Sequence, residues 1–366
     1  MPATQHRAVP QRYRILFSFQ GAPDEALPSA GLVNVNGTLY GTTTAGGNYN
    51  DGTVFSLRTT GGRKVLLYSF KGGTDGANPV ADLLAVDGEF YGTTENGGAY
   101  GLGTVFRIDA NGKETVLHSF GNGSDGAQPR ASLTLLSGKL YGTTFEGGTY
   151  GDGTLFRISS DGAERVLHSF SVGYSFGTDG GHPVAGLIAI SGALYGTTPT
   201  GGKNAAGILF AMSAGGTETI LYTFDGGLPS AREPAAPLVL LKGTLYGTAG
   251  GGTNDYGTVF NISPSGQNED VLHSFGSGSS DGRDPVGLTV VKDKLYGTTY
   301  GGGTSGDGTL YSITTTGEET VLHNFGSQPH DGIYPEAILV DAKRTLFSTT
   351  YEGGASGVGI VFSLTP

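Results

Sequence analysis

The chain has 366 residues, a formal net charge of −11 and no cysteine. The acidic balance makes nucleic acids and anionic membranes poor partners, because affinity for them comes largely from neutralising phosphates. The lack of cysteine excludes disulfides, thiol nucleophiles and thiolate metal sites. Glycine (67 residues) and proline (16) are abundant in a chain that is 37% hydrophobic, which indicates many turns between short strands rather than disorder.

The N-terminal segment, residues 1–12, is polar and contains Pro2 and Pro10. We expect it to be disordered, ahead of a single domain that spans residues 13–366. The segment lacks the apolar core of a signal peptide. Either export is encoded upstream or the protein is cytoplasmic; the absence of cysteine and the scarcity of lysine favour an extracytoplasmic, secreted protein.

Internal repeats dominate the rest of the chain. The string LYGTT at residues 39–43 recurs with its tyrosine at positions 91, 141, 195, 246 and 296, and a seventh copy carries Phe347. One period shows the unit: residues 131–136, 139–144, 154–158 and 165–170 are expected strands, and turn signals or a glycine-rich loop separate them. Apolar residues occupy both alternating positions in these strands, so both faces of each sheet must be covered.

Four antiparallel strands per period, with both faces buried and seven copies, predict an all-β fold, a seven-bladed β-propeller. Residues 13–19 resemble the fourth strand of the unit, and the last repeat supplies only three strands within residues 336–364. We therefore expect the N-terminal strand to complete the C-terminal blade and close the ring as a monomer.

The pattern GLV…GxLYGTTxxGG…GTVF resembles the GloVer tandem-repeat family of bacterial surface and secreted proteins, over nearly the whole chain. The double glycine is also kelch-like, although the tryptophan of kelch repeats is missing. The resemblance implies a propeller in an envelope or extracellular setting, and it implies no reaction.

Several repeated positions are best explained as architecture. The LYGTT residues are alike in nearly every copy. The acids before the loop glycine are interpreted as turn-forming residues, and the histidines of the fourth strand alternate with tyrosines, which favours packing over metal binding. These positions are Asp75, Asp125, Asp179, Asp281 and Asp331, and His118, His168, His273 and His323. The loop acids lack the periodic pattern of a calcium site.

One position differs in every repeat, although its flanks are repetitive. It precedes the loop proline on the face that carries the long loops, and we expect it to ring the mouth of the central channel. Its residues are Leu27, Asn78, Gln128, His182, Glu233, Asp284 and Tyr334. Repeats 4 to 6 are also the least regular, which indicates either drift on an exposed rim or a site above those blades.

Three functions remain open at this stage. The first is a binding or recognition module for a glycan or a small polar ligand. It would use the polar members of the variable ring (Asn78, Gln128, His182, Glu233, Asp284 and Tyr334) and the rim aromatics Phe145, Tyr174, Tyr300 and Tyr351.

The second is a polysaccharide-active lyase or hydrolase on the same face. A lyase would use His182 or Tyr334 as the base, and Arg130, Arg232 and Arg283 to pair with a uronate. His182, Glu233 and Asp284 are candidate ligands for a single divalent metal ion at the channel mouth, and no other cofactor is indicated. The third function is a scaffold for proteins.

Overall fold

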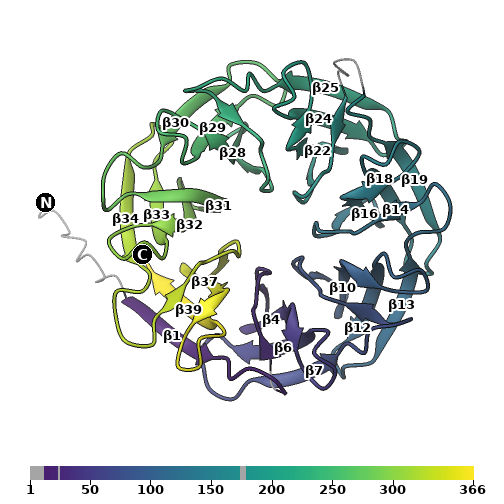
Figure 1. Cartoon of the computed structure of the whole chain (residues 1–366), viewed down its shortest axis with the longest axis horizontal. Coiled ribbons are helices and arrows are strands. Elements are labelled where there is room, and N and C mark those ends of the chain that lie inside the picture. Colours follow the sequence, from purple (N-terminus) through teal and green to yellow (C-terminus); the bar gives the residue numbers. More distant parts are fainter. Residues whose placement is uncertain (1–11, 24, 174–178) are drawn as a thin grey trace, which may run out of the picture.

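The computed structural model describes residues 12–23, 25–173 and 179–366. Its strands form a closed ring of seven blades, each an antiparallel sheet of four strands (Figure 1). The fold prediction is confirmed. The described residues contain no helix, and hence none that is long and apolar enough to cross a membrane.

Blades are numbered 1 to 7 by the repeat that supplies their first three strands. Within each blade the strands are counted from the axis outwards. The first strands of blades 1 to 7 are β3 (Val33–Val35), β9 (Leu84–Val86), β15 (Thr134–Leu136), β21 (Ile188–Ile190), β27 (Val239–Leu241), β31 (Gly282–Val291) and β36 (Val340–Ala342). The second strands carry the repeated string and are β4 (Thr38–Thr43), β10 (Glu89–Thr94), β16 (Lys139–Thr144), β22 (Ala193–Thr198), β28 (Thr244–Gly251), β32 (Lys294–Gly302) and β37 (Thr345–Thr350).

The third strands are β6 (Thr53–Arg58), β12 (Thr104–Asp109), β18 (Thr154–Ile158), β24 (Ile208–Ser213), β29 (Thr258–Ile262), β33 (Thr309–Ile313) and β39 (Ile360–Thr365). The outer strands are β7 (Val65–Ser69), β13 (Glu114–Ser119), β19 (Glu164–Ser169), β25 (Glu218–Thr223), β30 (Asp270–Ser274), β34 (Glu319–Asn324) and β1 (Arg12–Ser18).

The ring closes as expected. β1 is the outer strand of blade 7 and pairs with β39 from Arg12 opposite Thr365 to Ser18 opposite Ile360. The strand begins at Arg12, one residue earlier than predicted, and residues 1–11 lie outside the described part of the chain. The first and last strands of the sequence therefore share one sheet (Figure 1).

Two-residue strands join the long loops on one face of the ring. They are β2 (Glu25–Ala26), β5 (Ala45–Gly46), β8 (Gly76–Ala77), β11 (Asn96–Gly97), β14 (Gly126–Ala127), β17 (Glu146–Gly147), β20 (Gly180–Gly181), β23 (Thr200–Gly201), β26 (Ala231–Arg232), β35 (Gly332–Ile333) and β38 (Glu352–Gly353). Each pairs the loop before a blade with the loop between that blade's second and third strands, and β26 pairs with the end of β28. These pairs confirm that the two sets of long loops share one face.

The first strands are shorter than predicted. The expected strand over residues 131–136 is reduced to β15, Thr134–Leu136. Gln128 adopts a left-handed backbone conformation and Pro129 lacks an N–H, so the ladder is interrupted before β15 begins. In blade 6 the repeat is one residue shorter after Pro285, and β31 continues through this region with a register shift between Pro285 and Gly287.

Aromatic side chains between neighbouring blades form the core. Phe70 at the end of blade 1 packs edge-on against Phe106 of blade 2, with ring centroids 5.1 Å apart, and both are fully buried. Phe120 and Phe156 repeat the contact at the next junction, at 5.0 Å. Burying such rings between sheets supplies much of the favourable free energy of folding.

The LYGTT string is architectural, as predicted. A Cβ atom at Gly142 would lie 2.6 Å from the Phe156 ring, so only glycine lets this ring cross the second strand. Thr144 Oγ1 lies 2.8 Å from Thr154 Oγ1 and donates to the Glu146 carbonyl at 2.9 Å. The string therefore satisfies buried polar groups where the strand enters its loop.

Candidate functional site

The backbone of the variable position is the same in all seven blades. Its residues have φ between 53° and 58°, a left-handed conformation that is uncommon outside glycine. The N–H of Asn78 donates to the Asp51 carbonyl of blade 1, and the Asn78 carbonyl accepts from Glu95 of blade 2. This backbone links consecutive blades, so the side chains are left free to differ.

Arg130, Phe145 and His182 gather on the long-loop face of blades 3 and 4. The Arg130 guanidinium lies over the Phe145 ring, 3.8 Å from its centroid, and the His182 ring is 5.1 Å from the same centroid. Arg130 also donates to Glu95 at 2.9 Å. His182 Nδ1 lies 3.2 Å from Thr200 Oγ1. Three predicted site residues are thus neighbours, and the arginine has a carboxylate partner.

Tyrosines gather on blades 6 and 7. Tyr300 and Tyr334 stack with centroids 4.9 Å apart. Burial and the nearby Glu336 raise the pKa of both Tyr300 and Tyr351. Burial and the charge of Glu352 raise the pKa of Glu336 in turn. The predicted aromatics Tyr300, Tyr334 and Tyr351 therefore belong to one acidic neighbourhood, whereas Tyr174 lies outside the described residues.

Four further predicted residues lie over blades 5 and 6: Arg232, Glu233, Arg283 and Asp284. The Arg232 guanidinium contacts Asp255 at 2.5 Å and Glu233 at 3.5 Å. Arg283 lies 5.9 Å from the centroid of the Tyr256 ring. Burial raises the pKa of Asp284, and the charge of Arg283 opposes this shift.

The predicted ring residues do not converge on one hollow. Leu27 and Asn78 line a hollow of about 610 Å³ together with Glu95, Glu336 and Tyr351. Glu233 and Asp284 line a separate hollow of about 280 Å³. The larger one spans blades 7, 1 and 2, outside the irregular sector of repeats 4 to 6.

A third cavity, of about 190 Å³, lies on the channel axis and includes Asp82, Arg130 and Glu336 among its lining residues. Asp82 Oδ1 accepts from the Gly31 N–H at 2.5 Å, and burial raises the pKa of this carboxyl. Sequence reasoning missed Asp82, Glu95 and Glu336. A signal was available, because Asp82 stands where repeats 1 and 4 have Gly31 and Gly186, and Glu336 stands where four of the other six repeats have valine or alanine.

The metal-ligand candidates of the variable ring are not assembled. Among the described residues, His182, Glu233 and Asp284 do not form a group whose ligand atoms all lie within 4.8 Å of one another. Three other groups do, each with one histidine, one aspartate and one glutamate. They are His118, Asp125 and Glu164; His168, Asp179 and Glu218; and His273, Asp281 and Glu319.

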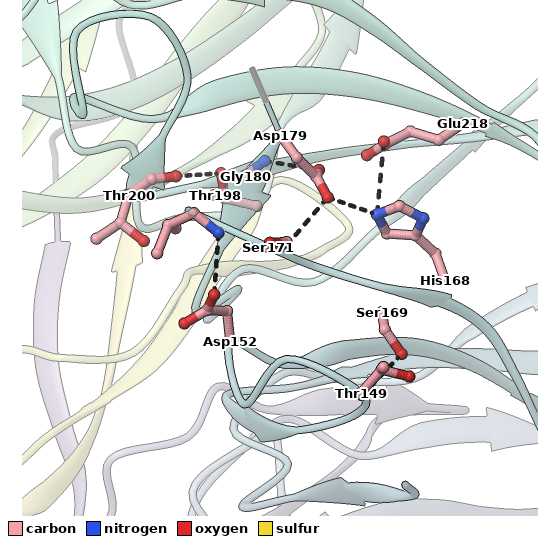
Figure 2. Close-up of polar contacts among 11 residues, drawn as sticks. Thr149, Asp152, His168, Ser169, Ser171, Asp179, Gly180, Thr198, Thr200 and Glu218 are labelled. Atoms are coloured by element: carbon pink, nitrogen blue, oxygen red, sulfur yellow. Dashed lines mark hydrogen bonds and ion pairs between the residues drawn. The ribbon is translucent and has the colours of Figure 1, made fainter. Parts of the chain in front are cut away.

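These groups lie at the seams between the outer parts of adjacent blades. Asp179 accepts from the Gly180 N–H at 2.7 Å, as the turn interpretation predicts, and its other oxygen lies 3.1 Å from His168 Nε2 (Figure 2). Glu218 of the next blade lies 3.5 Å from the same nitrogen. Burial lowers the pKa of His168, but the hydrogen bond to Asp179 and the charge of Glu218 outweigh it and raise the pKa.

The seam glutamates are held in a partly buried, acidic environment. Burial, aided by the charge of Asp75, raises the pKa of Glu114 to about 7. Burial and Asp125 do the same for Glu164, whose pKa is also raised to about 7. These pKa shifts could not be predicted from the sequence, because the glutamate and the aspartate come from different blades.

A model of the Gloeobacter/Verrucomicrobia repeat matches residues 5–176, 171–294 and 251–366. The chain belongs to this repeat family. Together the three matches cover every blade of the ring. No curated protein sequence matches the chain.

Solved structures share the propeller fold at low sequence identity. An oligogalacturonate lyase from Vibrio parahaemolyticus is 11% identical, with a TM-score of 0.61 over 98% of this chain and 97% of its own. A xyloglucanase from Xanthomonas campestris is 14% identical, with a TM-score of 0.61 over 93% of this chain and 52% of its own. A putative 6-phosphogluconolactonase from Bacteroides uniformis is 15% identical, with a TM-score of 0.53 over 87% of this chain and 88% of its own. These likenesses establish the fold and carry no activity across.

Proposed function

We propose that this repeat protein is an extracytoplasmic glycan-binding propeller. Its ligand is an uncharged, hydroxyl-rich sugar chain or chain end, bound in the hollow over blades 7, 1 and 2. The observation that carries the proposal is the composition of this hollow. The hollow has a volume of about 610 Å³, and its lining includes Tyr351 together with two carboxylates and two amides: Glu95, Glu336, Asn78 and Asn96.

These groups suit sugar hydroxyls. Carboxylates accept hydrogen bonds and amides both donate and accept them, so together they match groups that can do both. An aromatic ring covers the apolar face of a pyranose, and tyrosine adds a hydroxyl of its own. Asn78 is held in place, because its Nδ2 donates to the Thr44 carbonyl at 3.0 Å and its Oδ1 accepts from Asn96 at 3.2 Å.

The charge of the mouth favours a neutral ligand over a uronate. A lyase that acts on uronates needs arginines that are available for the substrate's carboxylate. Arg130 is paired with Glu95 at 2.8 Å and Arg232 with Asp255 at 2.5 Å. Two of the three candidate arginines are thus already neutralised, so little positive charge is left to pair with a polyanion.

The test is a glycan array followed by calorimetry on the best neutral oligosaccharide. Tyr351→Ala is expected to weaken binding by at least about tenfold, since stacking and a hydrogen bond are lost together. The matched control is Tyr150→Ala, because Tyr150 is 64% exposed and is not among the residues lining this hollow. Failure of every neutral glycan to bind, or equal affinity of the two variants, would overturn the proposal. Binding of a protein instead would favour a scaffold.

One observation supports hydrolysis as a second candidate function. Glycosidases use a carboxyl with a raised pKa as the acid and a nearby carboxylate as its partner. The pKa of Glu336 is raised by burial and by the charge of the nearby Glu352. If the hollow hydrolyses its ligand, Glu336→Gln abolishes turnover and retains binding. Release of no reducing ends by the wild type would leave binding alone as the function.

A further inference from the structure

The seams between blades are built from three recurring positions. One is in the outer strand of a blade, one is the acid of the following loop, and one is at or beside the start of the next blade's outer strand. Only three seams combine a histidine, an aspartate and a glutamate among the described residues. Elsewhere a member is replaced, as in Tyr68, Asp75 and Glu114; Tyr222, Ser230 and Glu269; and His323, Asp331 and Tyr13.

The seam between blades 5 and 6 differs from the other two complete seams. His273 Nε2 lies 3.7 Å from Asp281 Oδ1, too far for a hydrogen bond. His273 Nε2, Asp281 Oδ1 and Glu319 Oε1 are all buried and have no hydrogen-bond partner. One ligand atom from each of the three residues lies within 4.8 Å of the others. Three polar side chains therefore converge without satisfying one another.

The Asp281 carboxylate is held in this orientation. Its Oδ2 atom accepts from the Ser277 N–H at 2.8 Å and from the Ser277 hydroxyl at 2.9 Å. The side chain is only 8% exposed, and His273 is 17% exposed. The His273 ring also packs edge-on against Phe275, with centroids 4.7 Å apart. Both side chains are thus fixed by contacts that leave His273 Nε2 and Asp281 Oδ1 without a hydrogen-bond partner.

Buried polar atoms without hydrogen-bond partners cost free energy, and a bound ion between these three side chains would remove that cost. Two ligands that share a tetrahedral Zn²⁺ with bonds of about 2.1 Å are about 3.4 Å apart. The observed 3.7 Å between His273 Nε2 and Asp281 Oδ1 needs only a small inward movement. One imidazole and two carboxylates also balance a divalent charge and are ligands that Zn²⁺ accepts.

We propose that His273, Asp281 and Glu319 bind a divalent transition-metal ion of the Zn²⁺ type at the seam between blades 5 and 6. Asp281 also lines a hollow of about 220 Å³ beside Tyr256 and Arg283, which gives the ion a route in and room for a water ligand. The ion joins the outer strand of blade 5 to that of blade 6. Because it binds only the folded ring, it stabilises the protein.

The other two complete seams are weaker candidates. His118 Nε2 already lies 2.8 Å from the Asp125 carboxylate, and His168 Nε2 lies 3.1 Å from that of Asp179. Figure 2 shows the His168 ring facing both Asp179 and Glu218, with a contact to each. An ion would have to displace an existing hydrogen bond there. The seam of blades 5 and 6 is therefore expected to take the first equivalent of metal.

The experiment titrates the tag-free, chelator-treated full chain with ZnCl₂ in a calorimeter and counts bound zinc by mass spectrometry. Glu319→Gln removes one ligand charge and keeps the side-chain shape. The matched control is Glu269→Gln, at the same repeat position in the seam that carries Tyr222 and Ser230. We expect the tightest Zn²⁺ to be lost in Glu319→Gln, with one equivalent fewer per chain, and to be retained in Glu269→Gln. Zn²⁺ should raise the melting temperature of the wild type and of the control.

If Glu319→Gln does not fold, His273→Tyr replaces it, because tyrosine stands at this position in Tyr68 and Tyr222. CaCl₂ is the second titrant and is expected not to compete, since calcium requires six to eight oxygen ligands. Absence of Zn²⁺ binding to the wild type overturns the proposal. So does an unchanged tightest site in both Glu319→Gln and His273→Tyr.

Discussion

Consecutive blades are joined in two regions, at the ring of variable residues around the channel mouth and at the outer seams. The two regions use different kinds of contact. At the mouth the backbone makes the joint, as where the Glu233 N–H donates to the Ala206 carbonyl of the preceding blade. At the seams side chains make it, as where Asp331 accepts from Tyr13 and lies 3.0 Å from His323. The side chain is therefore dispensable to the architecture at the mouth and essential at the seam.

This difference explains the repeat pattern. The backbone joint at the mouth does not depend on one particular side chain, and seven different residues adopt the left-handed conformation there. At the seams the donors and acceptors must remain complementary, so aspartate, histidine, tyrosine and glutamate recur. Diversity at the mouth marks the surface that is free to bind a ligand.

The largest loss of stability is expected when one side of a seam is removed altogether. Deleting residues 1–20 takes away β1, the Tyr13 contact with Asp331 and the fully buried Phe19. We expect the free energy of unfolding to fall by at least about 4 kcal/mol, since truncating one buried phenylalanine alone costs about 3–5 kcal/mol. The exposed edge of β39 should also promote aggregation. Chemical denaturation and light scattering measure both effects.

The control for this truncation is deletion of residues 1–11, which precede β1. It is expected to leave the melting temperature and the monomeric state unchanged. A stable, monomeric 21–366 fragment would contradict the account of ring closure.

A matched pair of substitutions compares the two joints directly. Asp331→Ala removes the acceptor of the Tyr13 hydroxyl at 2.7 Å and of the Gly332 N–H at 2.9 Å, from a side chain that is fully buried. We expect a loss of about 3 kcal/mol. Asp284→Ala, at an exposed position of the mouth ring, is expected to change stability by no more than about 0.5 kcal/mol. Urea unfolding of both variants measures the two changes in the free energy of unfolding. Equal decreases would mean that the mouth side chains also hold the ring together.

The smallest effect is expected from protonation of a seam glutamate. Folding raises the pKa of Glu114 from 4.5 to about 7, chiefly through burial. Between these values the folded chain holds the proton more tightly than the unfolded chain. The contribution of this group is complete below about pH 4.5 and is lost as the pH rises towards 7. We expect wild-type stability, measured in the presence of a chelator, to fall over this range more steeply than that of Glu114→Gln.

The control is Glu146→Gln, at an exposed loop position, which should leave the wild-type slope unchanged. If Glu114→Gln kept the full wild-type slope, the seam between blades 1 and 2 would not be the source of the pH dependence.

The closed ring of seven blades could be predicted from the residue pattern alone. The period of the LYGTT string, the alternation of apolar residues and the match of residues 13–19 to an outer strand were enough to predict seven blades and their closure. This worked because a four-stranded sheet with two apolar faces must be covered on both sides, and repetition of one unit leaves few ways to do so. The turn role of Asp125 was also predictable, because its partner Gly126 is adjacent in the chain.

The contacts between side chains of different blades, in contrast, are known only from the folded ring. His273 and Glu319 belong to different repeats, and the sequence does not show that their side chains converge with Asp281 across the seam. The hollow at the mouth likewise combines Asn78 of blade 2 with Tyr351 of blade 7, which are distant in sequence and adjacent only because the ring closes. Periodicity fixes the backbone, whereas chemistry depends on the pairing of unlike residues across blades, and that pairing exists only in the folded ring.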